Sequence, residues 1–189
     1  MLNFQKDIEQ CLAVLKLGGL ILYPTDTIWG IGCDATNEEA VAKIYKLKNR
    51  TDSKAMIALV TEEQDVLKYV AALDLAVFDY LNETNRPTTV VYKNGIGLAG
   101  NLISEDGSIA IRICKDDFCR QLIKRFRKPI VSTSANLSGA SSPAHFEAIN
   151  LQIRNGVDYV VQYRQSDKTK AIPSTIIKWE NGKVQILRP

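Results

Sequence analysis

The chain has 189 residues and a formal net charge of +3 at pH 7, with 46% hydrophobic and 24% charged residues. This length suits a domain with its own hydrophobic core, and the composition argues against a disordered protein. No apolar run approaches the ~20 residues that span a bilayer. The first residues, including Lys6 and Asp7, are polar where a signal peptide would be apolar. We therefore expect one domain over residues 1–189 and no contact with a membrane.

The cysteines and the histidine narrow the chemistry further. Cys11, Cys33, Cys114 and Cys119 form no C-x-x-C motif. Such scattered spacing favours reduced, buried thiols and a cytoplasmic location. His145 is the only histidine, so a zinc site built on several histidines is excluded, and a serine–histidine relay would have to use this residue.

The hydrophobic pattern predicts alternating helices and strands along the chain. Ile8, Cys11, Leu12 and Leu15 form an i, i+3, i+4, i+7 stripe, which indicates a helix that Gly18-Gly19 ends. Capping patterns predict later helix starts at Asn37, Thr61 and Ser142-Pro143. In chain order we expect a helix over 5–17, a strand over 20–23, a helix from 37, a strand over 56–60, a helix from 61, a helix over 74–83, strands over 89–92 and 108–113, a helix over 116–126, a strand over 130–133, a helix from 143, and strands over 157–161, 175–179 and 183–187.

The last two strands are joined by Asn181-Gly182, which is a strong hairpin signal. A hairpin pairs its strands antiparallel, so the sheet cannot be purely parallel. The sequence therefore predicts an α/β fold: a single domain with a twisted sheet of parallel and antiparallel strands, flanked by helices.

The first candidate for chemistry is residues 23–30, which follow the strand expected over 20–23. Thr25, Asp26, Thr27 and Trp29 place two hydroxyls, a carboxylate and an indole ring close together. Loops at the carboxyl ends of strands in open α/β sheets are common ligand sites. The same residues also suit a capped turn in which Asp26 and the threonines bond the local backbone. The sequence leaves both interpretations open.

A second candidate is the group of cations Lys48, Arg50 and Lys54. Lys48 lies seven residues after Val41, on the core-facing stripe of its helix, where a cation is costly unless it is paired or faces a cavity. This charge density could neutralise a triphosphate, although solvated turns are similar in composition. The chain has no G-x-x-x-x-G-K-[ST] motif, so a nucleotide site here would not be a P-loop.

A third candidate combines the polar residues 132–139 with Arg112. The strand expected over 130–133 ends in hydroxyl and amide side chains, which suit a carboxylate, a ribose or a phosphate oxygen but also suit a local turn. Strand alternation puts Arg112 on the face opposite Ile111 and Ile113. That face must border water, a partner or a cleft.

These segments, in this order, resemble the YrdC-type L-threonylcarbamoyladenylate (threonylcarbamoyl-AMP) synthase family. The combination of K-x-R with S-x-N is specific, whereas either motif alone is weak. The matching pieces are PTDTIWGIGCDA at 24–35, K-x-R at 48–50, AIR at 110–112, STSANLSG at 132–139, PSTII at 173–177 and LRP at 187–189.

The resemblance implies a YrdC-like fold with a large concave basic cleft and without the C-terminal extension domain of longer relatives. It implies a nucleotidyltransferase that forms threonylcarbamoyl-AMP and pyrophosphate from L-threonine, bicarbonate and ATP, with Mg²⁺ carried by the ATP and no metal site on the protein. A partner threonylcarbamoyl-transferase complex would then modify adenosine 37 (t6A37) of ANN-decoding tRNAs, and the cleft is a candidate for direct tRNA contact.

The resemblance also implies roles for individual residues. Lys48, beside the phosphates, and Arg50 would be catalytic. The residues implied for ATP are Arg50, Lys54, Ser108, Ser134, Asn136 and Arg188. The residues implied for threonine are Thr27, Arg112, Thr133 and Ser174.

Three positions depart from the family pattern. Thr51 and Ala55 stand where proline is usual, which predicts a looser phosphate loop. Trp29 replaces a common tyrosine, which predicts a reshaped threonine pocket. The substrate preference is therefore less firmly implied than the use of ATP.

A non-enzymatic module that binds tRNA or double-stranded RNA with the same cleft is the alternative. Arg120, Lys124, Arg127 and Lys128 fall near one face of the helix expected over 116–126 and could face RNA, or simply solvent. The net charge of +3 is low for such a role. Threonine-dependent release of pyrophosphate from ATP separates the two hypotheses.

Overall fold

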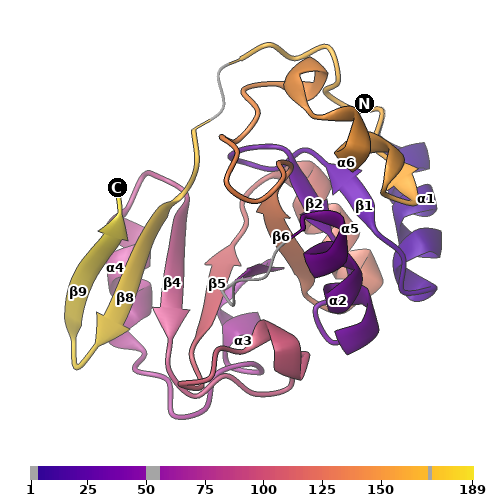
Figure 1. Ribbon diagram of the computed structural model, residues 1–189. Coiled ribbons are helices and arrows are strands. Elements are labelled where there is room, and N and C mark those ends of the chain that lie inside the picture. The colour runs from indigo at the N-terminus through magenta and orange to yellow at the C-terminus, as the bar shows by residue number, and fades with distance from the viewer. Residues whose placement is uncertain (1–3, 50–55, 170–171) are drawn as a thin grey trace.

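The computed structural model describes residues 4–49, 56–169 and 172–189. Its strands form one twisted sheet in the order β7-β1-β2-β6-β3-β5-β4-β8-β9 (Figure 1). The strands are β1 (Ile21–Tyr23), β2 (Gly30–Gly32), β3 (Ile57–Val60), β4 (Thr88–Tyr92), β5 (Ile109–Ile113), β6 (Ile130–Ser134), β7 (Tyr159–Val160), β8 (Thr175–Glu180) and β9 (Lys183–Arg188). The helices are α1 (Gln5–Lys16), α2 (Glu38–Leu47), α3 (Glu63–Val66), α4 (Ala76–Glu83), α5 (Asp117–Phe126) and α6 (Leu151–Asn155), with 3₁₀ turns at Gly100–Leu102 and Phe146–Ala148.

The sheet mixes parallel and antiparallel pairs, as the hairpin signal predicts. Strand β3 runs parallel to β5, and β4 runs parallel to β8, whereas β2, β3, β4 and β9 also make antiparallel pairs. The hairpin β8–β9 forms one end of the sheet in Figure 1, and β1 lies near the other end with α1 beside it. The predicted fold class, a mixed sheet flanked by helices, is confirmed.

Local sequence signals explain most helix ends. The Asn37 side chain accepts a hydrogen bond from the Ala40 N–H at 3.0 Å and begins α2. Asp116 does the same for the Cys119 N–H at 3.0 Å and begins α5. The apolar stripe of α5 is buried, while its basic face, including Arg120 and Lys124, is exposed. This pairing of a buried stripe with a charged face is that of an amphipathic surface helix.

Two expected helices differ from the structure. Thr61 does not cap a helix: its hydroxyl and N–H both donate to the Asp65 carboxylate, at 2.8 and 3.2 Å, and α3 begins at Glu63. Pro143 does not begin a helix either. A 3₁₀ turn follows instead, and α6 begins after Asn150, whose side chain accepts from the Gln152 N–H at 2.7 Å.

Strand β2 is an element that the sequence analysis left as loop. Its sequence, Gly-Ile-Gly, has a single β-branched residue between two glycines, and glycine is depleted in strands. Gly32 is required because the Tyr23 ring lies over it: a Cβ at this position would lie 2.6 Å from the Tyr23 Cε1 atom. The strand is therefore formed by close packing against β1 and β6 and not by its own propensity.

The core holds the cysteine thiols. Cys11, Cys33, Cys114 and Cys119 are all buried and free, as expected. Burial raises the pKa of each of Cys11, Cys33 and Cys119, which keeps these groups in the unreactive thiol form. Within the described ranges, no helix is both long and apolar enough to cross a bilayer.

Candidate functional site

Strand register defines the sheet face on which the candidate residues lie, which we call the site face. Leu59 of β3 pairs with Arg112 of β5 on one side and with Ile130 of β6 on the other. Residues two apart in a strand share a face, so Ser132 and Ser134 lie on the side of Arg112. Arg112 and the hydroxyl–amide segment that begins at Ser132 therefore share one surface.

At one end of the site face, Lys48 connects α2 to the S-x-N segment. Its side chain is buried, and Nζ donates to the carbonyls of Ser134 and Asn136, the latter at 2.7 Å. The Asn136 side-chain oxygen lies 3.4 Å from the same Nζ. This contact joins Lys48 to the hydroxyl–amide segment, and it satisfies a lysine that would otherwise be costly to bury.

Backbone contacts fix the same segment from both sides. The Ser138 N–H donates to the Lys48 carbonyl at 3.0 Å, and the Ala135 N–H donates to the Trp29 carbonyl at 3.1 Å. The Asn136 amide nitrogen donates to the carbonyls of Leu137 and Ala140. The S-x-N motif thus forms a closed turn whose shape depends on Lys48.

Toward the other end, Arg112 projects from β5 and is almost fully buried, with 3% of its side chain exposed. Its Nη2 donates to the Asp26 Oδ1 atom at 2.9 Å. Its Nε atom is buried and has no hydrogen-bond partner in the part of the chain described. Burying a guanidinium with an unused donor is costly, and such a donor is a natural ligand contact.

Next to Arg112 across the sheet lies a group of hydroxyls and a second arginine. Val90 pairs with Ile111, which puts Thr89 opposite Arg112. The Thr89 and Ser174 hydroxyls are 2.9 Å apart, and both residues are buried. Arg188, at the end of β9, donates through Nη2 and Nε to the Ser174 carbonyl at 2.8 and 3.2 Å. The segment PSTII is therefore joined to the closing Leu-Arg-Pro.

The two arginines are close enough to affect each other. Burial, and then the positive charge of Arg112, lower the pKa of the Arg188 guanidinium. Two cations that repel across a partly buried surface favour an anion between them. This surface can bind a carboxylate or phosphate group.

The turn between β1 and β2 matches the capped-turn interpretation for its threonines but not for Asp26. Thr25 bonds locally: its hydroxyl donates to the Ile28 carbonyl at 2.8 Å and lies 3.0 Å from the Thr27 hydroxyl. Asp26 does not bond locally, because it reaches Arg112 on a strand 86 residues away. The turn is therefore capped by its threonines and points its carboxylate toward the site face.

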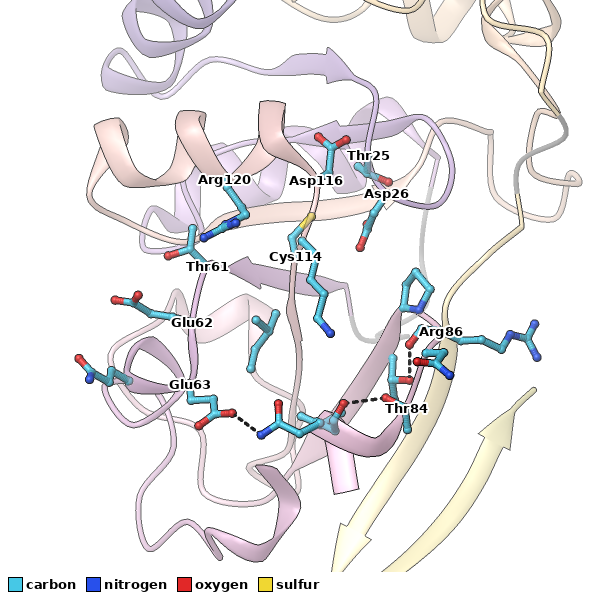
Figure 2. Close-up of a pocket in the computed structure, with 18 of the residues that line it drawn as sticks. Thr25, Asp26, Thr61, Glu62, Glu63, Thr84, Arg86, Cys114, Asp116 and Arg120 are labelled. Atoms are coloured by element: carbon cyan, nitrogen blue, oxygen red, sulfur yellow. Dashed lines mark hydrogen bonds between the residues drawn. The ribbon is translucent and has the colours of Figure 1, made fainter. Parts of the chain in front are cut away.

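Two neighbouring cavities border this turn. The larger, of about 920 Å³, is lined by Thr25, Asp26, Asp116, Arg120 and residues 61–64 and 84–88, among others. In Figure 2 the Asp26 carboxylate points into it. The smaller, of about 400 Å³, is lined by Asp26, Thr27, Trp29, His145 and Pro173, among others. Thr25, Asp26, Asn85, Arg86, Pro87 and Arg164 line both cavities. Thr27 thus borders a space of a size that suits an amino acid.

The structure does not bring two other predicted residues, Ser108 and Thr133, next to Arg112. Ser108 is nearly buried at the start of β5, four residues from Arg112, or about 13 Å along an extended strand. Thr133 alternates with Ser132 and Ser134 and so projects from the opposite face to Arg112. Arg50 and Lys54 lie outside the described residues.

With this geometry in hand, the chain can be compared with known proteins. The family model for Sua5, YciO and YrdC, described as telomere recombination, matches residues 13–189. This chain belongs to the Sua5/YciO/YrdC family. It is 33% identical over 171 residues to the putative threonylcarbamoyl-AMP synthase of Methanocaldococcus jannaschii, covering 90% of this chain and 79% of that one. It is 31% identical over 183 residues to the threonylcarbamoyl-AMP synthase of Pseudoalteromonas translucida, covering 95% and 97%.

Solved members of the family share the fold. The crystal structure of P. abyssi Sua5 complexed with L-threonine has a TM-score of 0.84 at 20% identity, covering 97% of this chain. This chain spans 54% of that longer protein. E. coli YciO has a TM-score of 0.80 at 20% identity, covering 97% of this chain and 89% of that one. The expected family and its fold are confirmed.

Thr89 is not singled out by the sequence, and Ser132 and Asp26 are named there without their place on or beside the site face. Thr89 lies in an ordinary strand, and only the sheet order reveals that it touches Ser174. Ser132 shares the face of Arg112 where Thr133 does not. The carboxylate of Asp26 was recognised as unusual, but its partner is 86 residues distant. A buried arginine in an apolar strand is the one signal that a carboxylate partner should exist.

Proposed function

We propose that the protein is an L-threonylcarbamoyladenylate synthase, a nucleotidyltransferase that uses L-threonine, bicarbonate and ATP and releases pyrophosphate. The observation that carries the proposal is the meeting of Lys48 with the S-x-N turn on the sheet face that also presents Arg112. Relatives named threonylcarbamoyl-AMP synthase support it, as does a structural neighbour complexed with L-threonine.

Threonine would bind near Arg112, with its carboxylate on the guanidinium and its hydroxyl toward Thr27 or Ser174. A planar guanidinium pairs well with a carboxylate because it presents two parallel N–H donors. The unused Nε of Arg112 and the neighbouring charge of Arg188 favour an anion at this point. Ser132, which shares the face, is a further hydroxyl within this surface.

ATP would bind nearer the Lys48 end, with Ser134, Asn136, Arg188 and Ser108 around it and Arg50 and Lys54 as further expected contacts. The described side chains here are cations, hydroxyls and an amide, which suit phosphate oxygens better than a metal ion. The phosphates would therefore carry the Mg²⁺, which would help to spread their charge. The protein's own task is to align the threonine carbamate oxygen with the α-phosphate.

Catalysis of this kind requires positioned charge and little proton transfer by side chains. The threonine amine and bicarbonate form a carbamate through CO₂, with net release of one water, since the proton lost by the amine balances the one that bicarbonate takes up on dehydration. A carbamate oxygen then displaces pyrophosphate from the α-phosphate of ATP. Lys48 and the arginines would stabilise the charge that accumulates on the phosphates. We further propose a cytoplasmic location, in keeping with the free buried thiols, and delivery of the product to a tRNA-modifying complex.

Mass spectrometry of the adenylate tests the proposal most directly. Purified protein is incubated with ATP, Mg²⁺, bicarbonate and each of L-threonine, L-serine or no amino acid, while pyrophosphate release is followed in parallel. The expected result is threonylcarbamoyl-AMP with threonine-dependent pyrophosphate. Salt-sensitive RNA binding without any threonine-dependent pyrophosphate would favour the RNA-binding module instead.

A further inference from the structure

We propose that Asp26 is a positioning residue, whose carboxylate holds the Arg112 guanidinium so that its remaining N–H groups face the carboxylate of the amino-acid substrate. This inference rests on the proposed function, because it concerns the same threonine site. It assigns a purpose to the one carboxylate of the β1–β2 turn, which is distinct from the roles of the threonines beside it.

The ion pair has the geometry that positioning requires. The Arg112 Nη2 to Asp26 Oδ1 distance is 2.9 Å, and the two side chains are 3% and 12% exposed. Removing two charges from water is costly, so such a pair persists only where its geometry is good. The Asp26 contact anchors the planar guanidinium at Nη2, and burial of the Arg112 side chain limits the directions that its other N–H groups can take.

The guanidinium retains binding capacity after this contact. Arg112 Nε is buried and lacks a partner among the described residues, so the N–H groups of the guanidinium are only partly used. Arg188 lies close enough that the charge of Arg112 contributes to lowering its pKa. A substrate carboxylate would accept from the unused N–H groups and would relieve the repulsion between the two arginines.

Asp26 therefore acts through Arg112 and not on the substrate carboxylate itself. Two carboxylates repel, so direct contact between Asp26 and the acid group of threonine would be unfavourable. A direct contact with the substrate amine is the competing explanation. The two explanations differ in which part of the substrate loses affinity when Asp26 is changed.

The experiment compares two ligands, L-threonine and L-threoninol, which carries the amine and the side-chain hydroxyl but no carboxylate. Binding is measured by calorimetry or NMR titration for wild type, Asp26→Asn and Asp26→Ala. We expect L-threonine affinity to fall about tenfold or more for Asp26→Ala. The fall should be smaller for Asp26→Asn, which keeps an acceptor oxygen. L-threoninol affinity should change little in either variant.

Asp34→Asn is the matched control. Asp34 is a buried carboxylate paired with the half-exposed Lys128 at 2.6 Å, so the variant loses an ion pair that does not involve Arg112. Its discrimination between threonine and threoninol should equal that of wild type. Equal losses of threonine and threoninol binding in Asp26→Asn would overturn the proposal in favour of contact with the amine, and unchanged threonine binding in both Asp26 variants would also overturn it.

A second measurement keeps the proposal testable even if Asp26→Ala folds poorly. In the Arg112→Lys background, Asp26→Asn should cost little further threonine affinity, because the effect of Asp26 runs through the guanidinium. Fully additive losses would contradict positioning. Failure of the proposed function looks different: wild type would then make no adenylate, whereas failure of this inference leaves wild-type synthesis intact.

Discussion

The two ends of the site face use their cations differently. At the lysine end (Lys48, Ser134 and Asn136), the ammonium donates to backbone carbonyls and closes a turn. At the arginine end (Arg112, Thr89, Ser174 and Arg188), the Arg112 guanidinium keeps a buried donor that no described residue accepts from. The lysine end is therefore shaped from within the chain, and the arginine end has binding capacity left for a ligand. Substitutions at the lysine end should consequently disturb the geometry of the turn, whereas substitutions at the arginine end should weaken binding of a ligand.

The largest effect is expected for Lys48→Met, which removes a cation and the tie between two carbonyls of the S-x-N turn. We expect kcat/KM for pyrophosphate release to fall by about 10²-fold or more, because charge and turn geometry are lost together. Lys48→Arg should also be impaired, since a planar guanidinium does not reproduce the two-carbonyl contact. Lys46→Met, on the exposed side of the same helix, is the control and should retain activity. Full activity in Lys48→Met would disprove a role for the lysine end.

The expected effect at the arginine end is next in size. Arg188→Gln loses the charged donors to the Ser174 carbonyl and the second cation beside Arg112. Hydrogen bonds to charged groups contribute about 1.5–3 kcal/mol, so a loss of roughly 10- to 100-fold in kcat/KM is expected. Lys183→Gln, at the exposed start of the same strand, serves as its control. An Arg188→Gln enzyme with wild-type kinetics for both substrates would show that the anion lies elsewhere.

This difference between the ends also explains what the sequence could predict. A buried lysine on a helix stripe and a hydroxyl–amide loop are both visible locally, so their segments could be named before their contact was known. The face of Arg112 follows from strand alternation. The neighbours of Arg112 cannot be predicted in this way. Thr89 lies beside it because β4 pairs with β5, and Asp26 contacts it because the β1–β2 turn projects toward β5.

Element prediction fails where packing or a competing hydrogen bond overrides the local pattern. The two glycines of β2 weaken its strand signal, yet the ring of Tyr23 requires Gly32. The Thr61 capping pattern is real in sequence, but the carboxylate of Asp65, four residues later, accepts from both the N–H and the hydroxyl of Thr61. The first case is decided by packing between strands, and the second by a local hydrogen bond.

A smaller effect is expected for Thr89→Val, which keeps the shape of the side chain but removes its hydroxyl. The Ser174 hydroxyl then loses its partner at 2.9 Å and keeps the longer contact with Arg188 Nη2 at 3.4 Å, and a lost hydrogen bond costs about 0.5–1.5 kcal/mol. We expect a lower Tm and a KM for threonine raised several-fold, with the KM for ATP changed less. Thr88→Val, one residue earlier and on the opposite face, is the control: it should lower Tm without changing the KM ratio. Thr89→Ser should restore the ratio.

The smallest effect is expected for Trp29→Tyr, which tests whether the indole shapes the threonine pocket. Trp29 is buried against Phe146, with ring centroids 4.9 Å apart, and it lines the smaller cavity together with Thr27. A tyrosine ring is smaller and carries a hydroxyl, so the wall moves while an aromatic contact is kept. We expect the ratio of kcat/KM for threonine to that for serine to change by less than about threefold, since one methyl-sized difference in a pocket discriminates only weakly. Steady-state pyrophosphate release with both amino acids measures this ratio, and Phe146→Tyr provides the control because it alters the partner ring and leaves the indole in place. A tenfold or greater change would mean that this ring has a major part in the choice between threonine and serine.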